Sequence, residues 1–171
     1  TYTILLIMWV TFLAQWITLL VAPQLHNTLF TLSSYHVEYV WTWFTSIFAH
    51  DPGGLAHIAF NSIAIFFFGP LVARYLSDRQ YWALFIGAGV LAGLSQVLIG
   101  LAMNNPTAVL GASGGAMAIL GVITILHPNL KVYFMFFIPM PLWILTLGFA
   151  AISLLLMGGG GLLGNVAHAA H

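Results

Sequence analysis

The sequence GASGG at residues 111–115, continued by the apolar run AMAILGVITIL at residues 116–126, decides how this chain folds. Glycine, alanine and serine let helices approach closely inside a lipid bilayer, and an uncharged apolar run is typical of a helix that lies there. The run is shorter than the about 20 residues that a lipid-exposed span needs. We therefore expect neighbouring helices to surround it, with Ser113 at its start, where water can enter.

The composition of the whole chain agrees with a membrane environment. Of its 171 residues, 61% are hydrophobic and 4% are charged, and the mean hydropathy is +1.04, whereas about a quarter of the residues in a soluble domain are charged. An ordinary soluble domain is therefore excluded. The formal net charge is +0, so we expect no nucleic-acid partner. The absence of cysteine excludes disulfides and thiolate metal sites.

Further apolar stretches have the length of a membrane-spanning helix. The expected spans are Thr3–Ala22, Leu55–Tyr75, Tyr81–Met103, Ala112–Leu126 and Val132–Met157, with a sixth that starts near Gly164 and runs past the end of the chain. The predicted fold class is therefore all-α, a polytopic membrane helix bundle of six spans whose sixth span is truncated in this chain. We expect a single transmembrane domain over residues 1–171.

Two segments interrupt this pattern. Residues 23–50 form a long connector with several aromatic side chains, which are typical of the membrane–water interface, so we expect a re-entrant or interfacial element there. Pro139 and Pro141 lie near one end of the fifth expected span, and proline weakens a helix because it has no N–H. Since membrane helices tolerate proline, we expect a kink within this span.

The few charged residues predict the orientation of the bundle. The basic residues are Arg74, Arg79 and Lys131. If every expected span crosses the bilayer, all three lie on one face, which the excess of Lys and Arg in cytoplasmic loops marks as cytoplasmic. The same count places His57, Ser113 and His171 near the starts of the second, fourth and sixth spans, toward the non-cytoplasmic face.

Ser113 and His171 together suggest nucleophilic acyl chemistry. A serine hydroxyl attacks a carbonyl group when a neighbouring base takes its proton, and a carboxylate often orients that base. The acids are Glu38, Asp51 and Asp78. Asp78 falls on the cytoplasmic face and the other two in the long connector, so a Ser–His dyad without an acid is favoured. The alternative is that residues 111–115 only pack helices together.

His57 and Asn61 are one helical turn apart and share a helix face. Polar groups within a membrane span are expensive, and they are usually functional or paired. These two side chains can donate hydrogen bonds to the oxyanion of an acyl-transfer intermediate, as the Ser113 backbone N–H at a helix start also can. The alternative is a purely structural contact between helices.

Three short motifs occur in a recognisable order. They are His57-x-x-x-Asn61, Gly111-x-Ser113-Gly114 and Ala170-His171. In order and approximate spacing they resemble the rhomboid family of intramembrane serine proteases, and the resemblance covers most of the chain. Each motif is short, and the ordered set is more specific than any one of them. The chain departs from the family pattern at Thr42, Ala73 and Met117.

The resemblance implies a role for each motif. Ser113 would be the nucleophile, and His171 would act as general base and then as general acid. His57, Asn61 and the Ser113 backbone N–H would form the oxyanion hole. The family cleaves transmembrane protein substrates near the membrane boundary, within the lipid bilayer and without a metal or cofactor.

Other interpretations use the same residues. His168 lies three residues before His171 and is an alternative base, although the resemblance favours His171. Convergence of these two with His50 and His57 would make a histidine-ligated metal or haem site, which generally needs at least three protein ligands. A catalytically inactive rhomboid-like protein that binds membrane clients is the remaining alternative, and its signature would be loss of the serine or the histidine.

Overall fold

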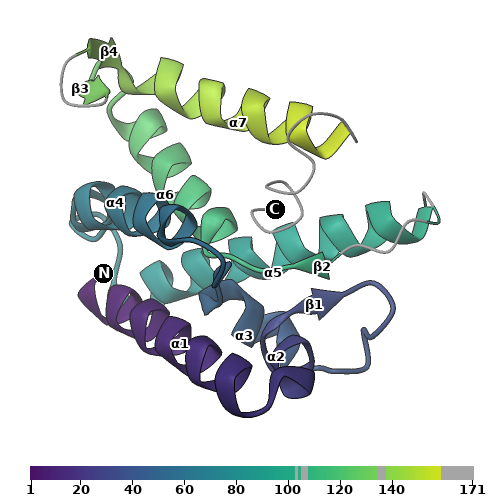
Figure 1. Ribbon diagram of the computed structural model, residues 1–171. Coiled ribbons are helices and arrows are strands. Elements are labelled where there is room, and N and C mark those ends of the chain that lie inside the picture. Colours follow the sequence, from purple (N-terminus) through teal and green to yellow (C-terminus); the bar gives the residue numbers. More distant parts are fainter. Residues whose placement is uncertain (103, 105–107, 135–137, 159–171) are drawn as a thin grey trace.

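A computed structural model of the protein describes residues 1–102, 104, 108–134 and 138–158 (Figure 1). Over these ranges the chain forms helices, turns and two short antiparallel strand pairs. The helices are α1 (Tyr2–Val21), α2 (Pro23–Phe30), α3 (Thr42–Phe48), α4 (Leu55–Val72), α5 (Asp78–Ala102), α6 (Ser113–Leu126) and α7 (Leu142–Gly158). The strands are β1 (Leu32–Ser33), which pairs with β2 (Ala108–Val109), and β3 (Lys131–Phe134), which pairs with β4 (Ile138–Pro141).

Three of the described helices, α1, α4 and α5, are long and apolar enough to cross a membrane. α6 is a shorter apolar helix of 14 residues. The protein is therefore mostly helical, as the sequence predicts, with three candidate membrane spans within the described residues. The expected sixth span, from near Gly164, lies outside them.

α6 packs against helices on several sides, among them α5, α4 and α7 (Figure 1). Ile119, Leu120 and Ile123 of this helix are buried in the core of the bundle. A helix as short as α6 would leave part of a bilayer unspanned if lipid surrounded it. Its burial among longer helices removes that difficulty and places its first residues inside the protein.

Residues without side chains allow α6 to approach α5 closely. A Cβ atom on Gly114 would lie 2.8 Å from the Cβ of Ala92, on α5. A Cβ atom on Gly115 would overlap the ring of Phe85, which also belongs to α5. Phe85 is fully buried, so its ring has little room to move away. The contact between these two helices therefore depends on the glycines that follow the serine.

The expectation of one continuous helix over Val132–Met157 is wrong. The first part of this segment forms the hairpin of β3 and β4, and α7 begins only after Pro141. Pro139 and Pro141 provide the physical reason, because proline has no N–H for a helical hydrogen bond and its ring clashes with the turn before it. The two prolines thus set where α7 starts. The hydroxyls of Thr124 and Thr146, 2.8 Å apart, then join α6 to α7.

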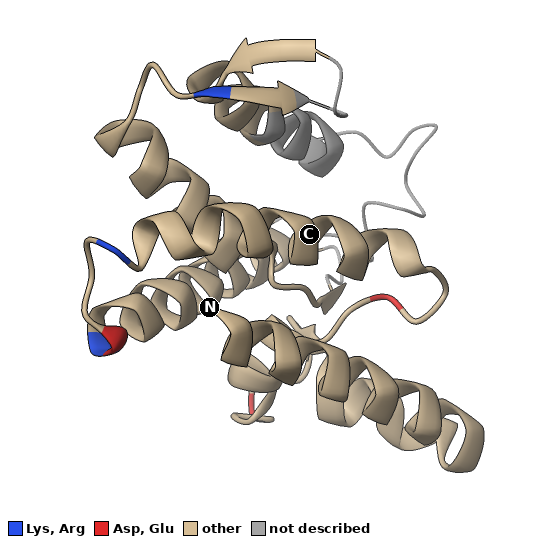
Figure 2. Ribbon diagram, turned by 90° about the vertical axis from the view of Figure 1, so that its left-hand side faces the viewer, with Lys and Arg blue, Asp and Glu red and all other residues tan. Residues whose placement is uncertain are grey.

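α4 and α6 run in the same direction, with contacts near both ends. The Tyr75 hydroxyl and the His127 Nε2, 2.6 Å apart, join the segments that follow the two helices. The residues just after α4, Arg74 among them, therefore lie at the same end of the bundle as the end of α6. His57 and Ser113 belong to the first turns of the two helices, at the other end. Figure 2 shows that the charged residues lie in connectors, at the start of a helix and on a strand.

Residues 23–50 form a structured connector that contains α2, β1 and α3. β1 pairs with β2, with Leu32 opposite Val109, so the connector is tied to the segment that precedes α6. The indole N–H groups of Trp41 and Trp43 donate to carbonyl oxygens of earlier connector residues over 2.7 and 3.2 Å. Main-chain acceptors and aromatic donors thus hold this segment in one shape.

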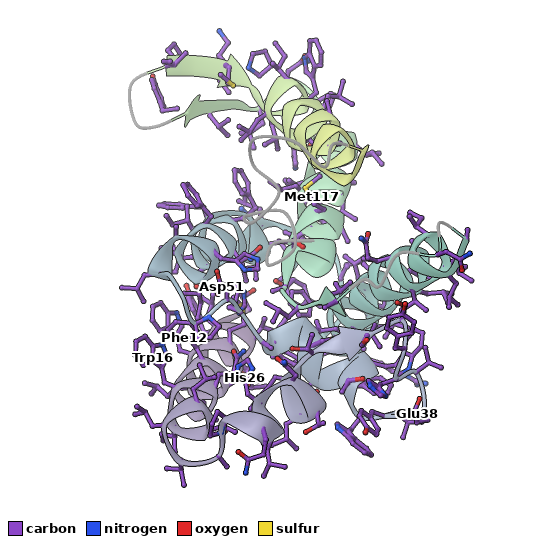
Figure 3. The ribbon with its side chains drawn as sticks, turned by 45° about the vertical axis from the view of Figure 1, so that its right-hand side comes forward. Phe12, Trp16, His26, Glu38, Asp51 and Met117 are labelled. Carbon is purple, nitrogen blue, oxygen red and sulfur yellow. The ribbon has the colours of Figure 1, made fainter. Side chains whose placement is uncertain are left out.

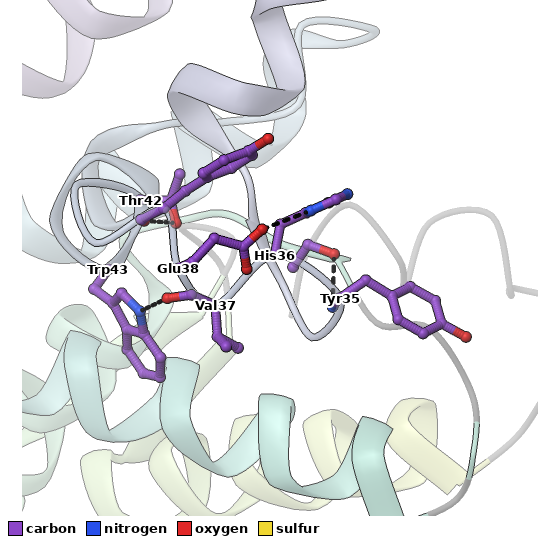
Figure 4. A network of polar contacts seen from close by, with 8 residues as sticks. Tyr35, His36, Val37, Glu38, Thr42 and Trp43 are labelled. Carbon is purple, nitrogen blue, oxygen red and sulfur yellow. Dashed lines mark hydrogen bonds and ion pairs between the residues drawn. The ribbon is translucent and has the colours of Figure 1, made fainter.

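The exposed part of the connector contains a contact between a histidine and a carboxylate, shown in Figure 4. His36 Nδ1 lies 3.1 Å from Glu38 Oε1, and both side chains are exposed. A main-chain hydrogen bond and then the His36 side chain lower the pKa of the Glu38 carboxyl below its usual value. A contact this exposed adds little to stability, because water competes for both side chains.

A buried polar cluster joins α1 to the connector. The Gln15 side chain is fully buried and bonds to both main-chain groups of His50. The Gln15 Nε2 also lies 3.3 Å from the Nε2 of His26. His50, which lies between α3 and α4, donates its Nδ1–H to the Phe48 carbonyl over 3.1 Å. Burial, and then the nearby His57, lower the pKa of His50 to about 3, so its ring is neutral near neutral pH.

We expect Gly115→Ala to destabilise the protein, because the added methyl group overlaps the buried ring of Phe85. Overpacking of this kind typically costs about 1–3 kcal/mol. Gly121→Ala is the matched control, since a Cβ there meets nothing within 4 Å and alanine is favoured over glycine inside a helix by about 1 kcal/mol. Thermal unfolding in detergent micelles should give a lower midpoint for the first variant alone. Equal midpoints for the two variants would contradict this packing.

The pKa of His50 predicts how stability depends on pH. Between the usual value of 6.5 and about 3, the unfolded chain binds a proton at this histidine that the folded protein does not bind. The free energy of unfolding therefore falls as the pH is lowered through this window, by at most about 1.4 kcal/mol per pH unit. We expect His50→Gln to lose less stability than the unchanged protein when thermal unfolding is compared at about pH 7 and about pH 5. Equal losses would show that His50 takes up its proton in the folded protein as easily as in the unfolded chain.

Candidate active site

Ser113 is the first residue of α6, and a turn at Gly111 precedes it. Gly111 has a φ of +133°, a conformation that residues with side chains rarely adopt. Its N–H donates to the carbonyl oxygen of Ser46, in α3, over 2.8 Å. This turn ends the segment that follows β2 and lets α6 begin. The first N–H groups of a helix have no partner within the helix, which places the Ser113 N–H among the donors of this helix start.

The His57 ring lies against the turn at Gly111. A Cβ atom on Gly111 would lie 2.9 Å from the His57 Nε2 and 3.9 Å from the Ser113 Oγ. The missing side chain of Gly111 therefore leaves the space that the imidazole fills. The His57 Nε2 and the Ser113 Oγ therefore both lie within 4 Å of the position that a Gly111 Cβ would occupy. The structure thus brings together two of the residues that the sequence singles out.

Asn61 follows His57 by one turn of α4 and is 8% exposed. Its Nδ2 donates to the main-chain carbonyl of His57 over 3.2 Å. An asparagine amide carries two N–H donors, and this contact uses one of them. The amide is thus held at the first turns of α4, on the helix that also carries the His57 ring.

His50 and Asp51 lie beside the His57 ring. The two imidazole centroids are 4.9 Å apart, with their planes at 63°, so the edge of one ring meets the face of the other. The Asp51 N–H donates to the His57 Nδ1 over 3.5 Å, which is long for a hydrogen bond. The Asp51 carboxylate accepts the N–H of Gly53 over 2.8 Å and so closes the turn that precedes α4.

Met117 lies one turn after Ser113 on α6 and is labelled in Figure 3. Its side chain is partly buried and packs against the core of the bundle. An apolar side chain therefore lies one turn after the serine, at one of the positions where the chain departs from the family pattern.

The predicted base and its alternative, His171 and His168, lie outside the described residues. The contact between Ser113 and His171 therefore stays a prediction. Within the described ranges no group of three or more His, Cys, Asp or Glu side chains is arranged to hold a metal ion. Of the four histidines that a metal or haem site would need, His50 and His57 are adjacent.

Two residues that shape the site were not singled out from the sequence. The Ser46 carbonyl anchors Gly111, and a main-chain contact of this kind leaves no mark on the sequence. Gln15 holds the main chain beside the His57 ring. Its signal was present, because a glutamine within an apolar span has to be paired or functional.

Comparison with known proteins identifies relatives. The chain is 32% identical over 137 residues to "RHOMBOID-like protein 12, mitochondrial" of Arabidopsis thaliana, which covers 71% of this chain and 40% of that protein. It is 31% identical over 84 residues to "Putative rhomboid protease YdcA" of Bacillus subtilis (strain 168), which covers 48% and 39%. The alignments thus span about two fifths of the length of these curated relatives. No solved structure matches the chain significantly.

The family model of the rhomboid domain matches residues 37–171. This range begins in the connector and contains α4, α5, α6 and α7, with both His57 and Ser113. The match and the long apolar helices identify an integral membrane protein. The resemblance inferred from the three ordered motifs is confirmed, and the chain belongs to the rhomboid family.

Proposed function

We propose that the protein is an intramembrane serine endopeptidase that cleaves transmembrane protein substrates near the membrane boundary. The main support for this proposal is the arrangement at Gly111, where the His57 Nε2 and the Ser113 Oγ both lie close to the position that a Gly111 Cβ would occupy. Membership of the rhomboid family supports it, since one matched relative is named a putative rhomboid protease.

In the proposed mechanism, His171 takes the proton of Ser113 while the Oγ attacks the carbonyl carbon of the scissile peptide bond. His171 then gives this proton to the leaving amine, and the amine end of the substrate departs. Water, activated by the same histidine, hydrolyses the acyl-enzyme and restores Ser113. His168 is the alternative base. No metal or cofactor takes part in these steps.

The oxyanion formed by the attack needs donors close to the serine. The proposed donors are the side chains of His57 and Asn61 and the backbone N–H of Ser113. These donors come from the first turns of α4 and α6. The N-terminal ends of both helices carry the positive ends of the helix dipoles, which also favour a negative charge there. Loss of one such donor typically costs about 2.7–4 kcal/mol of transition-state stabilisation.

We place the site on the non-cytoplasmic side, below the membrane surface. Arg74 lies at the end of the bundle opposite Ser113, and basic residues are enriched on the cytoplasmic side. The 14 residues of α6 extend over about 21 Å, whereas the hydrocarbon core of a bilayer is about 30 Å thick. If α6 ends at the cytoplasmic interface, Ser113 lies about 9 Å inside the other boundary of that core. Water then reaches the serine through a recess in the protein.

The six-span bundle is part of the same proposal. The described part of the chain ends in α7. A sixth span that starts near Gly164 would enter the bilayer from the non-cytoplasmic side. It would carry His171 in at the end of the bundle where Ser113 lies.

We expect a fluorophosphonate probe to label the unchanged protein in membranes, because the probe reacts with an activated serine hydroxyl. Ser113→Ala should abolish both the labelling and the cleavage of a transmembrane substrate. Ser95→Ala is the matched control, since the Ser95 hydroxyl bonds to the Leu91 carbonyl within α5. Ser95→Ala should leave both the labelling and the cleavage unchanged. Mass spectrometry of the labelled peptide from the unchanged protein should identify Ser113 as the modified serine.

The same assay separates the proposed base from its alternatives. His171→Ala should abolish labelling, whereas His168→Ala should retain it, and the reverse result would exchange their roles. A folded protein that is not labelled at Ser113, yet still associates with membrane clients, would be an inactive rhomboid-like protein. A Soret band or stoichiometric metal in the purified protein would favour a histidine-ligated site.

The proposed orientation can be measured with single cysteines, because the chain has none of its own. We expect a membrane-impermeant maleimide to label Gly54→Cys, which lies just before α4 in open space, from the outside of intact cells. Asn129→Cys lies exposed after α6 and should be labelled only after the membrane is permeabilised. The opposite pattern would place the site on the cytoplasmic side.

A further inference from the structure

Gln15 lies within α1 and is fully buried. A polar side chain within a membrane span is expensive unless partners satisfy it. The Gln15 Oε1 accepts the main-chain N–H of His50, and its Nε2 donates to the main-chain carbonyl of the same residue, each over 2.9 Å. Through this two-point contact, a side chain of α1 fixes the main chain of His50, between α3 and α4.

The amide of Gln15 fits these contacts in only one orientation. If its oxygen and nitrogen were exchanged, the amide NH₂ would face the His50 N–H and the amide oxygen would face the His50 carbonyl oxygen, and neither pair can form a hydrogen bond. The Nε2 also lies 3.3 Å from the Nε2 of His26, labelled in Figure 3. Because an amide nitrogen only donates, the His26 Nε2 accepts this hydrogen bond. The His26 Nδ1 then carries the ring proton and donates it in a hydrogen bond to the Asn27 Oδ1 over 3.2 Å. The cluster therefore holds Gln15 firmly.

The main chain that Gln15 holds continues directly to the His57 ring. Asp51, the residue after His50, donates its N–H to the His57 Nδ1 over 3.5 Å. The His50 ring lies against the His57 ring, 4.9 Å away between centroids, and limits its rotation. A ring nitrogen that accepts a hydrogen bond carries no proton in neutral imidazole, so the proton is on Nε2. The Nε2 is the nitrogen that borders Gly111, beside Ser113.

We propose that Gln15 is a positioning residue for the oxyanion hole. By holding the main chain at His50 and Asp51, it sets the tautomer and the orientation in which His57 presents its Nε2–H toward Ser113. This inference rests on the proposed function of His57 as an oxyanion donor. Gln15 lies before residues 37–171, which match the rhomboid domain, so α1 contributes to the site from outside the matched range.

The tautomer of His57 can be measured by 15N NMR on histidine-labelled protein in micelles, with the signal assigned through His57→Gln. We expect the unchanged protein to carry the proton on Nε2. Gln15→Met has a similar volume but cannot hold the main chain of His50, so His57 should become a mixture of both tautomers. Thr18→Val is the matched control in α1, because the Thr18 hydroxyl bonds within the helix over 2.7 Å, and it should leave the tautomer unchanged.

Turnover of a transmembrane substrate gives a second readout. Gln15 acts through His57, so we expect Gln15→Met to lower kcat by about tenfold with KM unchanged, whereas loss of an oxyanion donor typically costs about 10²–10³-fold. Thr18→Val should change neither constant. A glutamine that only stabilised the fold would alter the unfolding midpoint and the amount of active protein, but not the tautomer of His57.

Two results would overturn the proposal. One is a proton on the Nδ1 of His57 in the unchanged protein, which can be observed even if Gln15→Met does not fold. The other is a folded Gln15→Met protein that keeps both the tautomer and kcat. Failure of the proposed function is a different result, since Ser113 of the unchanged protein would then not react with a fluorophosphonate. The NMR measurement decides the role of Gln15 independently of that reaction.

Discussion

The close approach of α6 to its neighbours is the constraint on which the rest of the structure depends. Gly114 and Gly115 let the helix pack closely on α5, where a single added carbon would meet atoms of that helix. Gly111, just before them, leaves room for the His57 ring. In lipid, helices associate through close packing rather than through exclusion of water, so small residues decide where they meet. The residues that pack the helix are therefore the ones that place the serine beside the histidine.

The parallel course of α4 and α6 gives the bundle a direction. His57 meets the turn at Gly111 at one end, and Tyr75 bonds to His127 at the other. Two contacts at opposite ends restrain both the separation and the tilt of the two helices. The polar groups of the site thus gather at the helix starts, where backbone N–H groups also point outward.

Hydropathy and motif spacing predicted much of this arrangement, and particular residues show where such reasoning stops. The start of the second expected span at Leu55 agrees with α4, because an apolar run follows a turn sequence there. The fifth expected span was wrong over residues 132–141, because an apolar run of this length fits either a strand or a helix. Only the two prolines in it argue against a helix. Spacing predicted that His57 and Asn61 share a helix face and that His57 and Ser113 lie toward the same side of the bundle, and the His57 ring and Ser113 do meet at Gly111. The contacts of Gln15 and Asp51 were not predicted, since they run through the main chain, which has no sequence signature.

The contact between Gln15 and His50 also bears on what counts as the domain. Similarity to the rhomboid domain begins at residue 37, yet the two hydrogen bonds cross that boundary. A piece of the chain cut at residue 37 would leave a buried N–H and a buried C=O without partners, at a typical cost of about 1–3 kcal/mol for each group. The core that α1 helps to build therefore extends beyond the range that similarity recognises.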